Sequence, residues 1–381
     1  MKIFRLLTAT LLVVALTDTG FSASLPDSTQ ALLKQFSLDP AMLANIDKEL
    51  AVPDRWIEEA KKEGKLRIRS TPAQPSELKT LLGPFKERYP FIEVEFSGTN
   101  QRDRSVRTLM SYKSGRILAD FMTSIGGFIA EYEKANALED LSDIPGARAV
   151  PAEAKDPAGH WLSINQNFWC MSYNSRLVKK EELPKKWEDI LTDPKWRNGN
   201  LGMGNRPQLT ALFLWKAKGE QWTKNFVTKL FTEVKPQLRR EGMNQLTQLV
   251  AAGEFLAAWP SNNKRPYQMQ LEGAPVGFTC PEPVPVSTED AVILRGGNVH
   301  TAKLFTNWLL SKEGQLAQYA FEYATPFDPE LRAKLMPFRD QILGRAEVFG
   351  NREFEDKVMP ELSRFWNDLW LHGGGTRAPS R

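Results

Sequence analysis

The sequence has 381 residues, a formal net charge of +4 and 41% hydrophobic residues. A chain of this length exceeds one typical domain of about 150 residues and is able to bury two hydrophobic cores. Its charge is too close to neutral to favour a nucleic-acid partner, which a strongly basic surface would attract.

The first 24 residues have the pattern of a signal peptide. Lys2 and Arg5 give a positive start, residues 6–16 form an apolar run, and residues 22–24 are small, as a cleavage site requires. An uncleaved anchor is the less favoured alternative, because a span of the bilayer needs about 20 apolar residues. We therefore expect an exported, periplasmic protein.

Residues 25–157 alternate between helical and strand patterns. Apolar residues at helical spacing predict helices, and apolar residues at every second position predict strands. The predicted helices span residues 25–52, 53–62, 77–88 and 103–114, and the predicted strands span residues 65–69, 92–96 and 120–122. An irregular, proline-containing stretch then separates this part from the rest.

The stretch from residue 160 to 207 begins with an apolar run typical of a strand, residues 161–173. Pro184 holds the residue before it in an extended conformation, so a new helical turn is able to begin just after it. Trp187 and Ile190 then lie on one helical face. This block predicts the start of a separate structural unit.

The remaining chain continues with mixed elements. Further strands are predicted at residues 200–203, 255–258 and 286–294, and further helices at residues 209–218, 222–230, 242–252, 302–310 and 313–319. The proline-rich run 280–285 is incompatible with a helix or a central strand, so we interpret it as an extended crossing. Residues 331–370 show more helical patterns, and the tail from residue 373 is expected to be disordered.

Short motifs follow one another in a specific order between residues 55 and 330. They include Tyr173-Asn174, Leu183-Pro184, Trp187-Glu188-Asp189-Ile190-Leu191, Asp193-Pro194-Lys195-Trp196, Gly253-Glu254 and Trp308-Leu309-Leu310-Ser311-Lys312-Glu313-Gly314-Gln315. Each motif is weak alone. Together the sequence resembles periplasmic solute-binding proteins of ABC importers (extracellular solute-binding protein family 1), in the branch that includes the iron(III)-binding members.

The resemblance implies an α/β fold of the type II periplasmic binding protein class. Two lobes, each a mixed sheet flanked by helices, would enclose a ligand cleft. The implied parts are a signal peptide (1–24), an N-terminal helical extension (25–52), lobe one (53–157 plus 285–345), lobe two (158–284), and a C-terminal helical segment with a disordered tail (346–381). The implied protein is a monomer without a cofactor that closes on a small solute and delivers it to an ABC permease in the inner membrane.

Two junctions between a strand and a loop form the predicted ligand site of lobe one. Ser70 and Thr71 follow one strand, and Ser124 and Gly126 follow another. Ligands of open α/β sheets bind at the carboxyl ends of strands. Ordinary turn chemistry explains either loop alone, but their matching positions favour a site.

Lobe two is expected to contact the ligand through two further segments. Asn205 and Arg206 precede a predicted helix, whose N-terminus would suit an anion. Residues 261–267 are predicted to form a loop that offers Asn263, Arg265 and Tyr267. Lys264 is expected to face solvent, whereas the fork of Arg265 is able to bind two oxygens at once. Trp169 or Trp259 is a further candidate for lining the cleft.

This loop departs from the iron-binding pattern. In the iron(III)-binding relatives adjacent tyrosines at this place bind the metal through their phenolates. Here Lys264 and Arg265 occupy it, with only Tyr267 nearby. Two cationic side chains disfavour a metal cation and suit carboxylate or phosphate oxygens. We therefore expect a small organic anion such as a carboxylate, phosphate ester or phosphonate. The alternative is iron(III) held by Tyr267, a carboxylate and a synergistic anion.

The chain contains only two cysteines, Cys170 and Cys280. In an exported protein an even pair is compatible with a disulfide. Two buried free thiols explain the same pair equally well, because free cysteine is among the most buried residue types. Both possibilities remain open at this point.

The motifs favour binding over catalysis. His160, His300 and His372 have no second metal ligand at short spacing, so the sequence predicts no metal site. Nucleophile-elbow, phosphate-loop and paired-cysteine motifs are also missing from the sequence. We therefore predict a binding protein and not an enzyme. An exported sensor subunit or an enzyme on the same scaffold is the remaining alternative.

Overall fold

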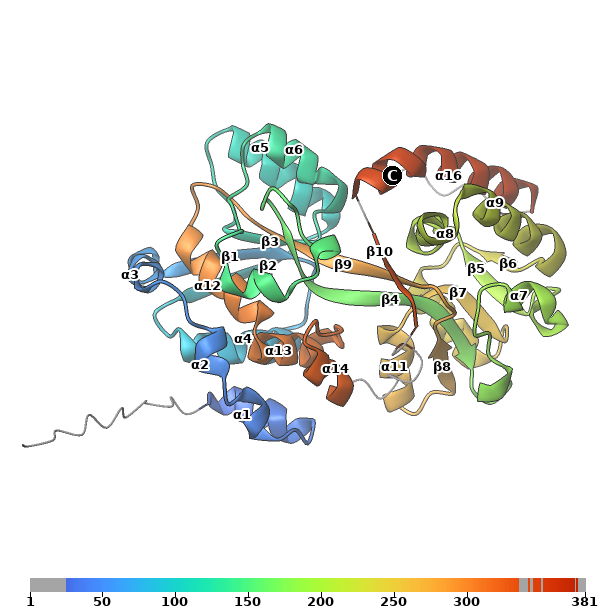
Figure 1. Ribbon diagram of the computed structural model, residues 1–381, viewed down its shortest axis with the longest axis horizontal. Helices are drawn as coiled ribbons and strands as arrows, with labels where there is room; N and C mark the ends of the chain where they lie inside the picture. The colour runs from blue at the N-terminus through green and yellow to red at the C-terminus, as the bar shows by residue number, and fades with distance from the viewer. Residues whose placement is uncertain (1–24, 336–341, 343–344, 351, 374, 376–381) are drawn as a thin grey trace, which may run out of the picture.

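The computed structural model describes residues 25–335, 342, 345–350, 352–373 and 375. The predicted signal peptide and nearly all of the predicted disordered tail lie outside these residues. The molecule consists of two lobes joined by two long strands, β4 (Leu162–Asn174) and β9 (Val284–Ile293) (Figure 1). We call the half that contains the N-terminal helices lobe one, and the other half lobe two.

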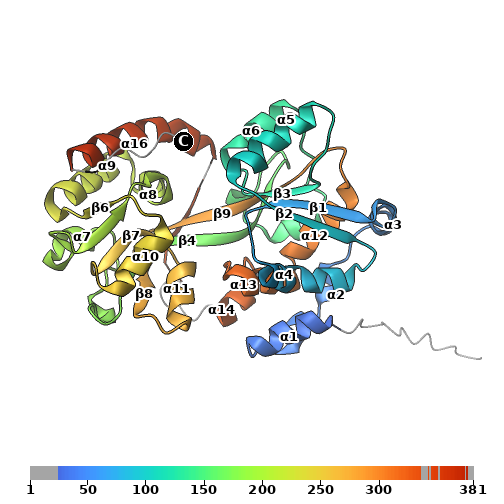
Figure 2. The same cartoon turned by 180° about the vertical axis from the view of Figure 1, so that it is seen from behind.

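Lobe one has a sheet covered by helices on both faces (Figure 2). β2 pairs in parallel with β1, β1 in parallel with β3, and β3 antiparallel with β9. Its elements are α1 (Asp27–Gln35), α2 (Ile46–Glu49), α3 (Asp54–Glu63), β1 (Lys65–Ser70), α4 (Pro75–Arg88), β2 (Glu93–Gly98), α5 (Thr108–Lys113), β3 (Phe121–Thr123), α6 (Ile129–Lys134), α12 (Val299–Leu310), α13 (Lys312–Glu322) and α14 (Pro329–Leu335).

Lobe two contains the strands that continue the sheet beyond β4. β7 pairs antiparallel with β4 and in parallel with β5, while β8 pairs antiparallel with β4. Its elements are α7 (Asp189–Thr192), β5 (Leu201–Gly204), α8 (Ala211–Lys218), α9 (Glu220–Lys229), β6 (Gln237–Arg239), α10 (Met243–Ala252), β7 (Ala257–Asn262), α11 (Lys264–Leu271), β8 (Val276–Thr279) and α16 (Arg352–His372), with β10 (Glu347–Phe349) along the start of β9.

Short 3₁₀ and π-helical turns fill several connections. They are η1 (Pro40–Leu43), η2 (Asp103–Arg107), η3 (Gly126–Phe128), η4 (Pro145–Ala149), η5 (Ala152–Ala154), η6 (Lys180–Glu182), η7 (Pro194–Trp196), η8 (Pro207–Leu209) and η9 (Leu230–Val234). The predicted helical face around Trp187 reduces to the single turn α7, and Trp187 precedes it as a buried residue.

β4 changes its partners along its length. Residues 162–168 pair with β9, whereas residues 169–174 pair with β7 and β8. Twelve of its 13 residues are buried, including five of its six Ser, Asn and Gln residues. β4 and β9 thus carry the sheet from one lobe to the other, and the cleft lies above them.

The C-terminal helix α16 completes the core of lobe two. Trp366 of α16 lies 5.7 Å from Trp259 of β7 and 5.3 Å from Phe231, measured between ring centroids. Trp259 is only 1% exposed. The prediction that Trp259 is able to line the cleft is therefore wrong, because α16, a distant segment of the chain, covers it. Among the residues described, no helix combines the length and apolar character needed to cross a membrane.

The N-terminal extension packs on lobe one. Leu32 and Leu33 of α1 are buried in the same cluster as α4 and α13 residues. Thr29 donates a hydrogen bond to Glu313, with 2.6 Å between the oxygens, and Glu49 accepts one from the backbone N–H of Lys312 at 2.8 Å. These contacts anchor both ends of the extension on α13.

Two local predictions are wrong for identifiable reasons. Residues 261–267 do not form a loop, because β7 continues to Asn262 and α11 begins at Lys264. The Asn262 side chain accepts the N–H of Arg265 at 2.9 Å, and Pro266 lies in the first turn, where no N–H partner is needed. Pro285 belongs to strand β9, at a position that pairs with β10 before the pairing with β4 begins.

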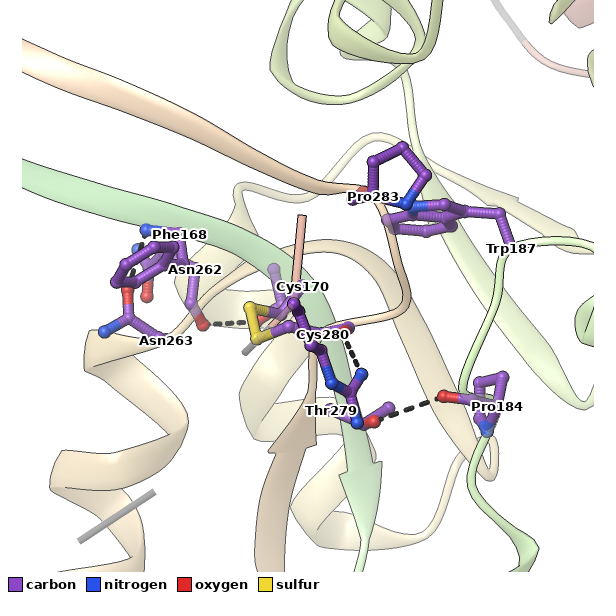
Figure 3. Close-up of a disulfide and its surroundings, with 11 residues drawn as sticks. Phe168, Cys170, Pro184, Trp187, Asn262, Asn263, Thr279, Cys280 and Pro283 are labelled. Carbon is purple, nitrogen blue, oxygen red and sulfur yellow. Dashed lines mark hydrogen bonds between the residues drawn. A yellow bond between two sulfur atoms is a disulfide. The ribbon is translucent and has the colours of Figure 1, made fainter. Parts of the chain in front are cut away.

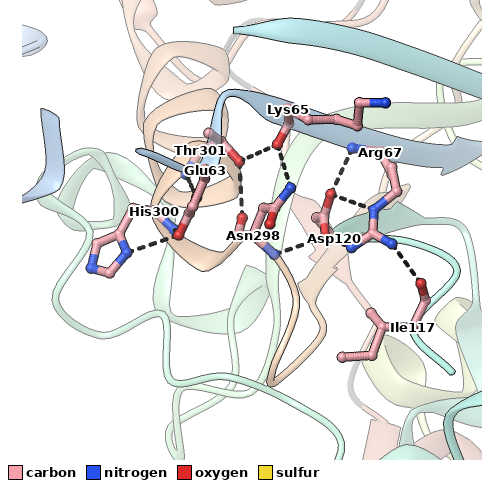
Figure 4. A network of polar contacts seen from close by, with 8 residues as sticks. All are labelled: Glu63, Lys65, Arg67, Ile117, Asp120, Asn298, His300 and Thr301. Atoms are coloured by element: carbon pink, nitrogen blue, oxygen red, sulfur yellow. Dashed lines mark hydrogen bonds and ion pairs between the residues drawn. The ribbon is translucent and has the colours of Figure 1, made fainter. Parts of the chain in front are cut away.

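A partly buried polar network connects β1 and α12 in lobe one (Figure 4). Asp120 is fully buried and accepts hydrogen bonds from the backbone N–H of Arg67 at 2.7 Å, from its Nη2 at 2.5 Å, and from the N–H of Asn298 at 2.8 Å. Glu63 accepts the N–H groups of His300 and Thr301 in the first turn of α12, where a helix favours negative charge.

Cys170 and Cys280 are joined by a disulfide in lobe two (Figure 3). Of the two states compatible with the sequence, the structure has the bonded one. The bond connects β4 to the segment after β8, next to the antiparallel pair Met171 and Thr279. Both cysteines are fully buried.

Candidate functional site

The cleft between the lobes contains two adjoining cavities of about 320 Å³ each. The acidic cavity is lined by Glu289, Asp290 and Glu322, together with Thr71, Ser124, Gly126, Asn167, Lys264 and Thr288. The basic cavity is lined by Lys264, Arg265 and Gln268, together with Asn167, Trp169, Asn244, Asn262 and Glu322. Their size is within the range of small-molecule sites.

Lobe one and β9 supply the carboxylates of the acidic cavity. Glu289 accepts a hydrogen bond from the Ser124 hydroxyl at 2.7 Å and one from the Asn165 side chain at 3.0 Å. Asp290 accepts the N–H of Ile125 at 3.1 Å. The loop after β3 therefore wraps around these two carboxyl groups, and Ser124 adopts a positive φ of 53° to do so.

Arg104 holds the two predicted ligand loops of lobe one together. It is 4% exposed and donates hydrogen bonds to the carbonyls of Ser124 at 3.0 Å, Thr99 at 2.6 Å and Ser70 at 3.3 Å. Burial lowers the pKa of its guanidinium, while Glu289 and Asp290 oppose that shift. In the sequence Arg104 is one of two arginines in the helix predicted at residues 103–114, so no local signal identifies its role.

An ion pair crosses the cleft. Lys264 of lobe two lies 3.2 Å from Glu322 of lobe one, measured from Nζ to Oε1. The Lys264 side chain is only 15% exposed, so the prediction that it faces solvent is wrong. Burial raises the pKa of Glu322, and Lys264 partly offsets that shift. Beside this pair, Arg265 donates a hydrogen bond to Gln268 at 2.7 Å.

Several predicted site residues come together in the cleft. Thr71, Ser124 and Gly126 line the acidic cavity, and Arg265 lines the basic cavity. Ser70 lies just behind them, where its hydroxyl is 2.7 Å from that of Thr123. It lines a small, mostly apolar cavity of about 40 Å³ beneath the cleft.

Four other predicted residues line neither cleft cavity. Asn263 is buried, and its side-chain oxygen accepts the N–H of Phe168 at 3.1 Å. Tyr267 packs on Tyr323 of lobe one, with 5.4 Å between ring centroids. Asn205 and Arg206 follow β5, outside the linings described above. Of the two tryptophan candidates, Trp169 lines the basic cavity.

Sequence reasoning missed the carboxylate wall of the cleft. Glu289 and Asp290 are adjacent charged residues inside a strand predicted as apolar, and this interruption was the available signal. Glu322 and Asn167 gave no comparable signal. Glu322 ends a helix, where a charged residue is ordinary, and Asn167 is the last of three consecutive polar residues, 165–167, so nothing singles it out.

One cluster outside the cleft has the composition of a metal site. The Nδ1 atom of His160 lies 3.3 Å from Glu133 and 3.6 Å from a carboxylate oxygen of Asp156. One ligand atom from each of the three residues lies within 4.8 Å of the others. The spacing of four residues between Asp156 and His160 was the available signal in the sequence, whereas Glu133 is 27 residues from His160. These groups are able to hold a divalent cation.

The ionised side chain of Asp290 should lower the free energy of unfolding at neutral pH. Burial, together with Glu289, raises its pKa above the ordinary value of 3.8, so the folded state binds this proton more tightly and stability falls as pH rises from 3.8 through the raised value. We expect Asp290→Asn to raise the free energy of unfolding by about 1 kcal/mol at pH 7 and by less at pH 3.5, as measured by thermal unfolding.

Asp140 provides the control with the opposite sign. Hydrogen bonds from Ser142 lower the pKa of Asp140, so Asp140→Asn should leave stability unchanged or reduce it slightly. If both substitutions changed the free energy of unfolding equally at pH 7, the conclusion that ionised Asp290 lowers stability would be wrong.

Comparison with known proteins agrees with this architecture. The family model of bacterial extracellular solute-binding proteins matches residues 118–337. Solved structures with the same fold include iron-bound HitA from Pseudomonas aeruginosa (18% identity, TM-score 0.62), IdiA (FutA) from Trichodesmium in complex with iron and citrate ligands (16%, 0.66), and an ABC transporter substrate-binding protein from Bradyrhizobium japonicum (18%, 0.64). Each match covers 80% of this chain and 99% of the other. The predicted two-lobed α/β fold is confirmed.

Proposed function

The chain belongs to the family of bacterial extracellular solute-binding proteins, and from that premise we propose that it captures a small polar solute between its lobes and delivers it to the permease of an ABC importer. The observation that carries the proposal is the pair Lys264 and Glu322, which comes from opposite lobes and lines both cleft cavities. A solute bound there contacts both lobes only when they meet, so its binding shifts the population towards the closed form.

An anionic group of the solute fits the basic cavity. Lys264, Arg265 and Gln268 together offer ammonium, guanidinium and amide donors. Charge-assisted hydrogen bonds to a carboxylate or phosphate are shorter and stronger than neutral ones, and the arginine fork is able to bind two oxygens at once. We therefore propose that the solute carries a carboxylate, phosphate ester or phosphonate group.

Iron(III) is the second candidate. Two of the structures with the same fold, those of HitA and IdiA (FutA), contain iron, and carboxylate oxygens such as those of the acidic cavity suit hard cations. The charge of Lys264 between the two cavities opposes a metal cation, and Tyr267 lines neither of them. Iron at stoichiometric level in the purified protein, with its visible colour, would favour this candidate over the organic anion.

We propose that the protein acts in the periplasm, to which the predicted signal peptide would direct it. We also propose that it acts as a monomer. The apolar face of the C-terminal helix α16 is buried on lobe two. The apolar side chains of that helix therefore pack in the core of their own chain. This supports a role as a free receptor that binds its permease transiently.

Arg265→Ala should abolish solute capture without unfolding the protein. Loss of the guanidinium leaves the anionic group of the solute without its bidentate partner, and we expect affinity to fall at least about 100-fold. The measurement is mass spectrometry of the solute that each variant retains from a bacterial metabolite extract, followed by calorimetry with the identified solute.

Arg176→Ala is the matched control, because Arg176 is exposed on lobe two and lines neither cavity. Its capture should equal that of the original chain. Unchanged affinity of Arg265→Ala would refute the role of Arg265, and failure of the original chain to retain any solute or metal would refute the proposed function.

A further inference from the structure

The walls of the cleft carry opposite charges. Lobe one and β9 present Glu289, Asp290 and Glu322, while lobe two presents Lys264 and Arg265. In the part of the chain that the structure describes, Glu289 and Asp290 accept hydrogen bonds from neutral donors and form no ion pair. A purely anionic solute would bring further negative charge to a wall that already holds three carboxyl groups.

The ion pair between Lys264 and Glu322 restricts which solutes are able to bind. A solute with only an anionic group takes Lys264 as its partner and leaves Glu322 without one. A solute with only a cationic group does the reverse. Removing one partner of a half-buried pair costs more than exchanging both partners, because the remaining charge stays desolvated. A solute with both charges replaces the Lys264–Glu322 ion pair by two ion pairs, one between its anionic group and Lys264 and one between its cationic group and Glu322.

Asn167 supplies an independent observation. It belongs to β4 and lines both cavities. Its side-chain oxygen is buried and has no hydrogen-bond partner among the described residues. Buried polar atoms are nearly always satisfied, and a donor on a ligand in either cavity would satisfy this acceptor. An ammonium group carries three N–H donors and no acceptor.

We propose that the solute is a small zwitterion whose ammonium group binds Glu289 and Glu322 beside Asn167, and whose anionic group binds Lys264 and Arg265. This inference rests on the proposed function and narrows its solute class. Both charges of the Lys264–Glu322 pair regain a partner in the complex, and the solute connects the two lobes through groups of opposite sign.

The test uses straight-chain probes that differ only in their ends. They are ω-amino carboxylates, dicarboxylates and diamines of equal chain length, over a series of lengths, measured by calorimetry and by thermal unfolding. We expect at least one ω-amino carboxylate to bind at least about 10-fold more tightly than the dicarboxylate and the diamine of its length.

A pair of variants separates charge recognition from folding. Glu322→Gln should reduce the preference for the ω-amino carboxylate over the dicarboxylate of equal chain length. Glu330→Gln should leave that preference unchanged, because Glu330 pairs with Lys312 at 2.6 Å outside both cavities. Circular dichroism checks that both variants are folded.

The possible outcomes separate this inference from the proposed function. Equal or tighter binding of dicarboxylates or diamines overturns the zwitterion, as does the absence of binding by every ω-amino carboxylate. If the solute retained from a metabolite extract contains acid groups but no amino group, the zwitterion is wrong and the proposed function stands. If the extract yields no retained solute, the proposed function itself fails.

Discussion

Replacing Asp120 by asparagine should lower the free energy of unfolding by about 3 kcal/mol. The carboxylate is completely buried and accepts hydrogen bonds from Arg67 and from the backbone N–H of Asn298. Asparagine keeps the volume but removes the charge, so the Arg67 guanidinium loses its counter-ion. We expect the lower end of the range for buried pairs, because the Arg67 side chain is 29% exposed and partly solvated.

Glu95→Gln is the matched control for Asp120→Asn. Glu95 also accepts a hydrogen bond from a basic side chain, that of Lys65, at 2.9 Å, but the Glu95 side chain is 51% exposed and that of Lys65 is 38% exposed. Its substitution should change stability by less than about 0.5 kcal/mol. Equilibrium unfolding in urea measures both variants. A loss below about 1 kcal/mol for Asp120→Asn would show that the network of Figure 4 contributes little to stability.

Removal of the disulfide should have an effect of similar size. Cys170 and Cys280 are separated by 110 residues, so the bond restricts a long loop of the unfolded chain. The loop-entropy model assigns about 5 kcal/mol to a closure of that length. We expect the double variant Cys170→Ala, Cys280→Ala to have a free energy of unfolding lower by up to this amount. The measurement is the midpoint of equilibrium unfolding, which should fall.

Reductant provides the control for the disulfide. It should destabilise the original chain and leave the double alanine variant unaffected, since the variant has no bond to reduce. Titration of the denatured, unreduced original chain should find no free thiol. Two free thiols in that titration would contradict the bond, and the stability difference between the variants would then reflect only the loss of two buried sulfur groups.

The cleft charges matter for both proposals. The cleft holds two basic side chains and three carboxylates. Burial raises the pKa of Asp290 and of Glu322, which indicates that their ionised forms lower the stability of the folded protein. A bound solute that neutralises these charges should therefore stabilise the protein as well as close it. Thermal unfolding is for this reason a suitable first screen for the solute.

Local sequence pattern was sufficient for much of the architecture. The alternation in residues 65–69 and the apolar run 161–173 predicted β1 and β4 within one or two residues. Short-range periodicity carries this information, because it depends on which face of one element is buried. The motifs around Trp187 and Trp308 indicated the family and with it the two-lobed fold.

The composition of the cleft depended instead on long-range contacts. Glu289 and Glu322 share a cavity with Lys264 only because β9 and α13 return to lobe one after the chain has built lobe two. Trp259 is covered by Trp366, which lies more than a hundred residues later in the chain. Local periodicity indicates whether a side chain lies on the buried or the exposed face of its helix or strand. It holds no information about which distant segment will face that side chain, and in this protein those facing segments set the charge and the lining of the ligand site.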